Sequence, residues 1–120
     1  MIFTGISRTF STKNGEQYIT IGSFWDEMSA LYGRENLRGL GYNWTEDTIE
    51  YVIGLRDGVI SGADCNVRLP DSGWKYVSGK TEDLGNMYTD IYCDGALKFE
   101  IEMFGDDGSC TVAYCRENVK

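Results

Sequence analysis

Histidine is absent from this sequence of 120 residues, proline occurs once, and only eleven basic residues stand against nineteen acidic ones. Without histidine there is no Ser-His-Asp triad, no histidine general base and none of the side chain that most often binds metals. The formal net charge of −8 argues against nonspecific binding to nucleic acid or to an anionic membrane, because both require a positively charged surface. We therefore expect no direct contact with nucleic acid or with a membrane.

Long apolar segments and known catalytic motifs are also missing. No apolar run approaches the ~18 residues that span a bilayer, and the N-terminal MIFTGISRTF lacks the apolar centre of a signal peptide. The four cysteines form no CxxC pair, so we expect reduced thiols in a cytoplasmic protein and no metal site. The sequence contains no GxSxG, Walker loop, GxGxxG or HExxH motif, and we therefore assign no catalytic residue and no cofactor.

Two kinds of periodicity predict the fold. Apolar residues recur at helical spacing in segments 17–32 and 82–93, whereas residues alternate as in strands elsewhere. The alternating runs are 2–11, 40–44, 49–55, 74–77, 98–104 and 109–116. We predict an α+β fold over a single domain, residues 1–120, built as a tandem βαββ repeat. Its antiparallel sheet has about six to eight strands, with both main helices on one side.

Aromatic side chains are abundant, with eight tyrosines, five phenylalanines and three tryptophans. Core packing accounts for many of them, because aromatic residues bury a large area each. Eleven Trp and Tyr residues nevertheless exceed what a core of this size needs. A pocket lined by several of them beside a carboxylate would bind an organic cation.

Carboxylates for such a pocket occur on a predicted strand. In segment 98–104, Glu100 and Glu102 share one face and alternate with Phe99, Ile101 and Met103 on the other. Either this charged face is simply solvated, or the sheet is concave there and a glutamate enters a cleft.

The order of these segments resembles the GyrI-like small-molecule-binding domain, which also forms the effector-binding half of some AraC- and MerR-type transcription regulators. The resemblance spans nearly the whole chain. The stretches that carry it are Phe24-Trp25, Leu40-Gly41-Tyr42, Tyr51-Val52-Ile53-Gly54, Gly73-Trp74-Lys75-Tyr76-Val77, Ile91-Tyr92 and Phe99-Glu100. It implies an SHS2-type fold and a bacterial, free-standing ligand domain, like the drug-binding members encoded in mobile gene cassettes.

The resemblance also implies a cleft between the two halves that binds hydrophobic, often cationic, compounds. We predict that one cavity is lined by Trp25, Tyr51, Trp74, Glu100, Glu102 and Tyr114. Family members often end in a strand reading Glu-Ile-Tyr-Ile-Pro, whose Glu lies in the pocket. Aligning Tyr114 with that Tyr puts Val112 in place of the Glu and Arg116 in place of the Pro, so the acidic role moves to Glu100, Glu102 or Glu50, or is absent.

Two other functions remain open. Some GyrI-like relatives hydrolyse strained toxins that contain a cyclopropane ring, with a pocket glutamate and an aromatic residue that activate water. Others bind a protein partner such as DNA gyrase, which also suits a free-standing acidic domain. The expected partner is an amphiphilic or aromatic cation, and a protein partner is the alternative.

Overall fold

The computed structural model describes residues 1–93 and 95–116, and over these residues it shows an α+β fold with one seven-stranded antiparallel sheet and two α-helices. The strands are β1 (Ile2–Ser11), β2 (Leu37–Tyr42), β3 (Thr48–Leu55), β4 (Cys65–Arg68), β5 (Lys75–Lys80), β6 (Leu97–Phe104) and β7 (Ser109–Arg116). The α-helices are α1 (Gln17–Tyr32) and α2 (Leu84–Cys93), and the short 3-10 helices are η1 (Lys13–Gly15), η2 (Arg34–Asn36) and η3 (Thr81–Asp83).

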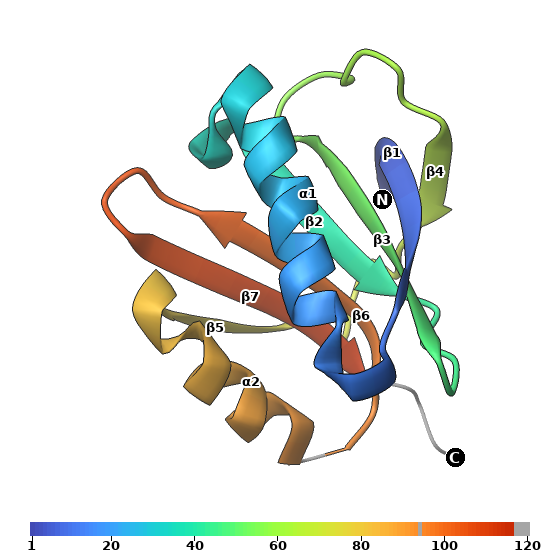
Figure 1. The fold of residues 1–120 in the computed structure, drawn as a ribbon, viewed down its shortest axis with the longest axis vertical. Coiled ribbons are helices and arrows are strands. Elements are labelled where there is room, and N and C mark those ends of the chain that lie inside the picture. The colour runs from blue at the N-terminus through green and yellow to red at the C-terminus, as the bar shows by residue number, and fades with distance from the viewer. Residues whose placement is uncertain (94, 117–120) are drawn as a thin grey trace.

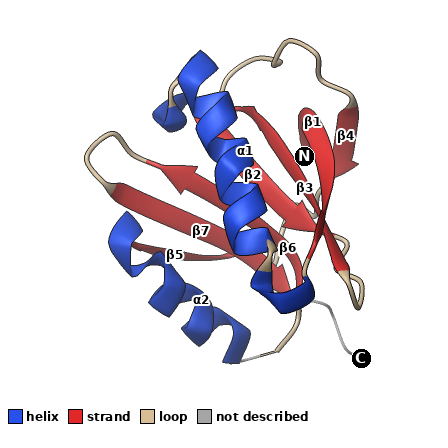
Figure 2. Ribbon diagram, viewed as in Figure 1, coloured by secondary structure: helices blue, strands red, loops and turns tan. Residues whose placement is uncertain are grey.

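The strands lie in the order β4-β1-β3-β2-β6-β7-β5, so β2 and β6 pair at the centre and β4 and β5 form the edges. Both helices cover the same face of this sheet, with α1 over the half that contains β1 to β3 and α2 near β5 and β7 (Figures 1 and 2). The opposite face carries no α-helix among the described residues.

The helices are fixed by their apolar faces. Helix α1 buries Phe24, Trp25 and Met28 against the sheet, and α2 buries Met87 and Ile91. These residues belong to one core cluster, which lies between the helices and the sheet. Because strand side chains alternate between faces, the strands also supply a second cluster on the other side. The members of this second cluster are Phe3, Leu40, Val52, Leu69, Phe99, Ile101, Ala113 and Cys115.

The structure confirms the predicted antiparallel sheet and both helices. Helix α1 has the predicted bounds, whereas α2 begins at Leu84 because residues 81–83 form the 3-10 turn η3. Strand β4 was not predicted from the sequence. It contains only four residues at the edge of the sheet, and so short a run carries too little alternation to distinguish it from a loop.

Neither α-helix in the described part of the chain is long and apolar enough to cross a membrane.

Candidate functional site

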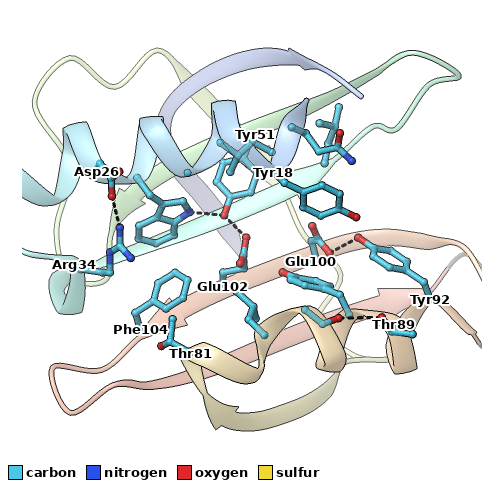
Figure 3. Close-up of a pocket in the computed structure, with 18 of the residues that line it drawn as sticks. Tyr18, Asp26, Arg34, Tyr51, Thr81, Thr89, Tyr92, Glu100, Glu102 and Phe104 are labelled. Carbon is cyan, nitrogen blue, oxygen red and sulfur yellow. Dashed lines mark hydrogen bonds and ion pairs between the residues drawn. The ribbon is translucent and has the colours of Figure 1, made fainter. Parts of the chain in front are cut away.

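A cavity of about 570 Å³ lies between α1 and α2, above the centre of the sheet (Figure 3). Residues from α1, β3, α2 and β6 and from the segments between them line it, and most are aromatic or apolar. The lining consists of Gln17, Tyr18, Ile21, Gly22, Trp25, Asp26, Arg34, Trp44, Ile49, Tyr51, Thr81, Leu84, Gly85, Tyr88, Thr89, Tyr92, Glu100, Glu102 and Phe104.

Glycines in β2 make room for the side chains at the floor of this cavity. A Cβ atom at Gly39 would collide with the Tyr51 hydroxyl and would lie 2.7 Å from Trp25. A Cβ atom at Gly41 would lie 2.9 Å from Glu100 Oε1. Because both glycines lack a side chain, the tyrosine and the glutamate from the neighbouring strands can lie over β2.

A chain of hydrogen bonds fixes one end of the floor. The indole Nε1–H of Trp25 donates to the Tyr51 hydroxyl at 2.8 Å, and this hydroxyl donates to Glu102 Oε1 at 2.6 Å. At the other end, the Tyr92 hydroxyl donates to Glu100 Oε2 at 2.9 Å (Figure 3). The tyrosines thus orient both carboxylates, since each is held through one oxygen.

Both glutamates are buried, with relative exposures of 5% for Glu100 and 8% for Glu102. Burial, followed by repulsion from Glu102, raises the pKa of Glu100 to about 8, although the hydrogen bond from Tyr92 opposes this change. Burial also raises the pKa of Glu102, whereas the hydroxyls of Tyr51 and Tyr88 and the positive charge of Arg34 oppose this change. Around neutral pH the pair therefore retains a proton, and it can act as an acid, a base or a counter-charge.

An ion pair closes the end of the cavity near Trp25. Arg34 donates to Asp26 Oδ1 at 2.8 Å, and its guanidinium lies over the rings of Trp25, at 5.8 Å, and Phe104, at 5.3 Å. The two rings meet edge to face at 4.8 Å. The positive charge of Arg34 also acts on Glu102 and lowers its pKa, so the cavity contains one cation beside the two glutamates.

The hydroxyl of Tyr88 is buried and close to Glu102, whose pKa it lowers, but it completes no hydrogen bond of good geometry in the described part of the chain. Its ring stacks on Tyr92, with centroids 5.7 Å apart. Burial, and next the charge of Glu102, raise the pKa of Tyr88 well above its usual value, so the hydroxyl stays protonated. A buried hydroxyl without a hydrogen-bond partner lowers the stability of the folded protein.

Four of the six predicted residues, Trp25, Tyr51, Glu100 and Glu102, line this cavity. The prediction that Trp74 and Tyr114 line the same cavity is wrong. Trp74 donates to the Pro70 carbonyl and packs against Phe99 in the second cluster, on the opposite face of the sheet.

Tyr114 does lie next to Glu100 across β6 and β7, but it lines a different hollow, together with Lys75 and Lys98. The guanidinium of Arg116 lies 5.2 Å from the Tyr114 ring centre and donates to carbonyl groups of α2 and the residues that follow it. Tyr114 therefore packs against the same core cluster as Trp25 and Tyr51 but lines a separate hollow beside Arg116. Glu50, the other acidic candidate, bonds to Asn43 and does not line the cavity.

The site predicted from the sequence did not include Tyr18, Trp44, Tyr88 or Tyr92. For Tyr88 and Tyr92 a signal was present, because they are one helical turn apart in α2 and adjoin its buried residues Met87 and Ile91. Trp44 was expected in a strand over residues 40–44, but β2 ends at Tyr42 and Trp44 lies in the segment between β2 and β3.

No protein-family profile, curated protein or solved structure matches the chain.

Proposed function

We propose that this chain is a binding domain for small hydrophobic, cationic organic compounds, which it holds in the cavity between α1 and α2. The observation that carries the proposal is a pair of buried glutamates on the floor of an aromatic cavity. Two carboxyl groups beside each other in an apolar site are unfavourable for the empty protein. A bound cation would offset this cost, because its positive charge attracts the buried carboxylates.

The aromatic walls of the cavity also support the binding of a cation. Aromatic faces attract cations with about 0.5–2 kcal/mol per contact, and five lining residues could offer such faces. They are Tyr18, Trp25, Trp44, Tyr88 and Tyr92. A volume of about 570 Å³ lies in the range of small-molecule pockets, which extends from roughly 300 to 1,000 Å³.

We further propose that the chain is a GyrI-like domain, a tandem βαββ repeat over residues 1–120 that works in the cytoplasm. The element order supports the repeat, since β1-α1-β2-β3 is followed, after β4, by β5-α2-β6-β7. The sheet order supports it too, because β1-β3-β2 on one side of the centre corresponds to β5-β7-β6 on the other. The four cysteines are free thiols, which suits a reducing compartment.

A thermal-shift screen of cationic dyes and drugs beside neutral isosteres tests the proposal. We expect cations to raise Tm, because a ligand at ~100 times its Kd stabilises the fold by about 2.7 kcal/mol. Glu100→Gln should weaken the best cation about tenfold in tryptophan-quenching titrations and spare neutral compounds. The matched control is Glu50→Gln, a strand glutamate outside the cavity. Equal Tm shifts with cations and isosteres would contradict the charge preference.

The aromatic wall is tested separately at Trp44. Trp25 is 3% exposed and belongs to the core, so its removal would destabilise the fold, whereas Trp44 is only partly buried. We expect Trp44→Ala to weaken cation binding at least about fivefold, the equivalent of one cation–π contact. Tyr76→Ala, at an exposed aromatic residue of β5, should leave the affinity unchanged. Equal losses in both variants would exclude a role for Trp44 in the wall.

A second candidate function is hydrolysis of a strained ring in the same cavity. The observation that favours it is again the glutamate pair, since a protonated and an ionised carboxyl group can act as acid and base towards one substrate. Incubation with cyclopropane-containing compounds, followed by mass spectrometry, would reveal addition of water. Binding without any such product would favour the binding domain.

A further inference from the structure

Resting on the proposed function, we infer that the cationic part of the ligand is a primary ammonium group, which donates its N–H bonds to Glu100, Glu102 and Tyr88. These side chains form the ammonium site at the floor of the cavity. The inference concerns the kind of cation, since a quaternary ammonium has the same charge but no N–H bond to donate.

The free oxygens of the two carboxylates are the first two acceptors. Glu100 uses Oε2 for the bond from Tyr92, and Glu102 uses Oε1 for the bond from Tyr51. Among the described residues these two bonds occupy one oxygen of each glutamate, and the Tyr88 hydroxyl lies close to Glu102. An ionised carboxylate accepts at both oxygens, so each glutamate has a place for one further donor.

The position of the glutamates on β6 suits a single nitrogen between them. They are two residues apart on one strand and point to the same face, into the space between α1 and α2 (Figure 3). Such positions are separated by roughly 6.6 Å along a strand. Two charge-assisted hydrogen bonds of about 2.8 Å each nearly span this separation, so one ammonium nitrogen can reach both carboxylates.

The third acceptor is the Tyr88 hydroxyl. It lines the same cavity, is buried and completes no hydrogen bond in the part of the chain that the structure describes. A tyrosine hydroxyl can accept as well as donate. A primary ammonium has three N–H bonds, and the site offers three acceptors for them. A trimethylammonium group would leave all three unmatched in a buried site, which is unfavourable.

The charge of the glutamate pair also suits the binding of one ammonium group. At neutral pH the glutamate pair retains about one proton because the pKa of Glu100 is raised to about 8. When the ammonium binds, this proton leaves for solvent, and the added positive charge balances the newly ionised carboxylate. The other titratable groups that line the cavity are Tyr18 and Asp26 from α1, Arg34 from η2, Tyr51 from β3, and Tyr88 and Tyr92 from α2. Asp26 and Arg34 are paired with each other, and burial raises the pKa of Tyr51, Tyr88 and Tyr92, so these three tyrosines stay neutral.

Three matched probes test the inference by isothermal titration calorimetry: biphenylbutylamine, its N,N,N-trimethyl derivative and biphenylbutanol. We expect the primary amine to bind at least tenfold more tightly than the trimethyl derivative. Repeating the titration in buffers with different ionisation enthalpies should show release of about one proton per amine bound at pH 7.

The variant Tyr88→Phe separates the hydroxyl from the rest of the site. Since the hydroxyl completes no hydrogen bond among residues 1–93 and 95–116, its removal should not impair folding. We expect the affinity for the amine to fall about fivefold and the affinity for the trimethyl derivative to stay the same. Tyr76→Phe, at an exposed tyrosine of β5 outside the cavity, is the matched control and should change neither.

The possible outcomes separate the two proposals. If the trimethyl derivative binds as tightly as the amine, the primary-ammonium inference is wrong while cation binding stands. If Tyr88→Phe weakens both cations equally, the hydroxyl is not an acceptor for the ligand and the inference is also wrong. If the alcohol matches both cations, or if no probe binds, the proposed function itself fails and the inference fails with it.

Discussion

Raising the pH from about 5 to about 9 is expected to weaken the fold by several kcal/mol as the buried pair of Glu100 and Glu102 loses its proton. Folding raises the pKa of the Glu100 carboxyl group from its usual value near 4.5 to about 8, so between these values the folded protein binds a proton that the unfolded chain has released. Stability is therefore complete below about pH 4.5 and is lost as the pH rises through 8, with a slope that approaches ~1.4 kcal/mol per pH unit.

The variant Glu100→Gln isolates this effect, because glutamine has a similar shape and does not titrate. We expect the free energy of unfolding of the variant, measured by urea denaturation, to exceed that of the parent by an amount that grows between about pH 5 and 8. The matched control is Glu50→Gln, which removes a strand glutamate outside the cavity. Parallel profiles for Glu100→Gln and the parent would mean that Glu100 is ionised in the folded state at neutral pH.

The second large effect is expected at Gly39. In Gly39→Ala the new methyl group would collide with the Tyr51 hydroxyl and approach Trp25. Both side chains are almost fully buried, with exposures of 1% and 3%, so they cannot move aside without disturbing the core. We expect a loss of about 2–3 kcal/mol in the free energy of unfolding, together with weaker cation binding, because Tyr51 orients Glu102.

Gly22→Ala provides a matched control for the glycine substitution. Gly22 lies in α1 and also lines the cavity, but a Cβ atom there would have nothing within 4 Å. Alanine in the interior of a helix stabilises it by up to about 1 kcal/mol relative to glycine. The two variants should therefore shift the denaturation midpoint in opposite directions. A neutral or stabilising Gly39→Ala would show that β2 does not need a glycine at this point.

Local patterns predicted a large part of the fold. The helical spacing of Phe24, Trp25 and Met28 was enough to predict α1, and alternation in segment 98–104 placed Glu100 and Glu102 on one face. Both patterns arise from the backbone period of a single element, so they require no knowledge of what that element packs against.

The parts that depend on long-range pairing were not predictable. Trp74 was expected to be the first residue of a strand, but β5 begins at Lys75, and a residue before a strand does not follow its alternation. Tyr114 was expected in the cavity, and its strand position is compatible with this, but it lines a separate hollow beside Arg116. The residue at which β5 begins and the position of the Arg116 side chain do not follow from the neighbouring sequence.

The edge strands β4 and β5 affect how copies of the chain meet in concentrated solution. An open edge can pair with the same edge of another molecule and begin a continuous intermolecular sheet. Here β4 contains only four residues, and β5 has a lysine at each end, Lys75 and Lys80. If two copies paired antiparallel along β5, Lys75 of one would lie opposite Lys80 of the other, and like charges at opposed positions repel. This arrangement disfavours the first step of self-association into fibres along the β5 edge.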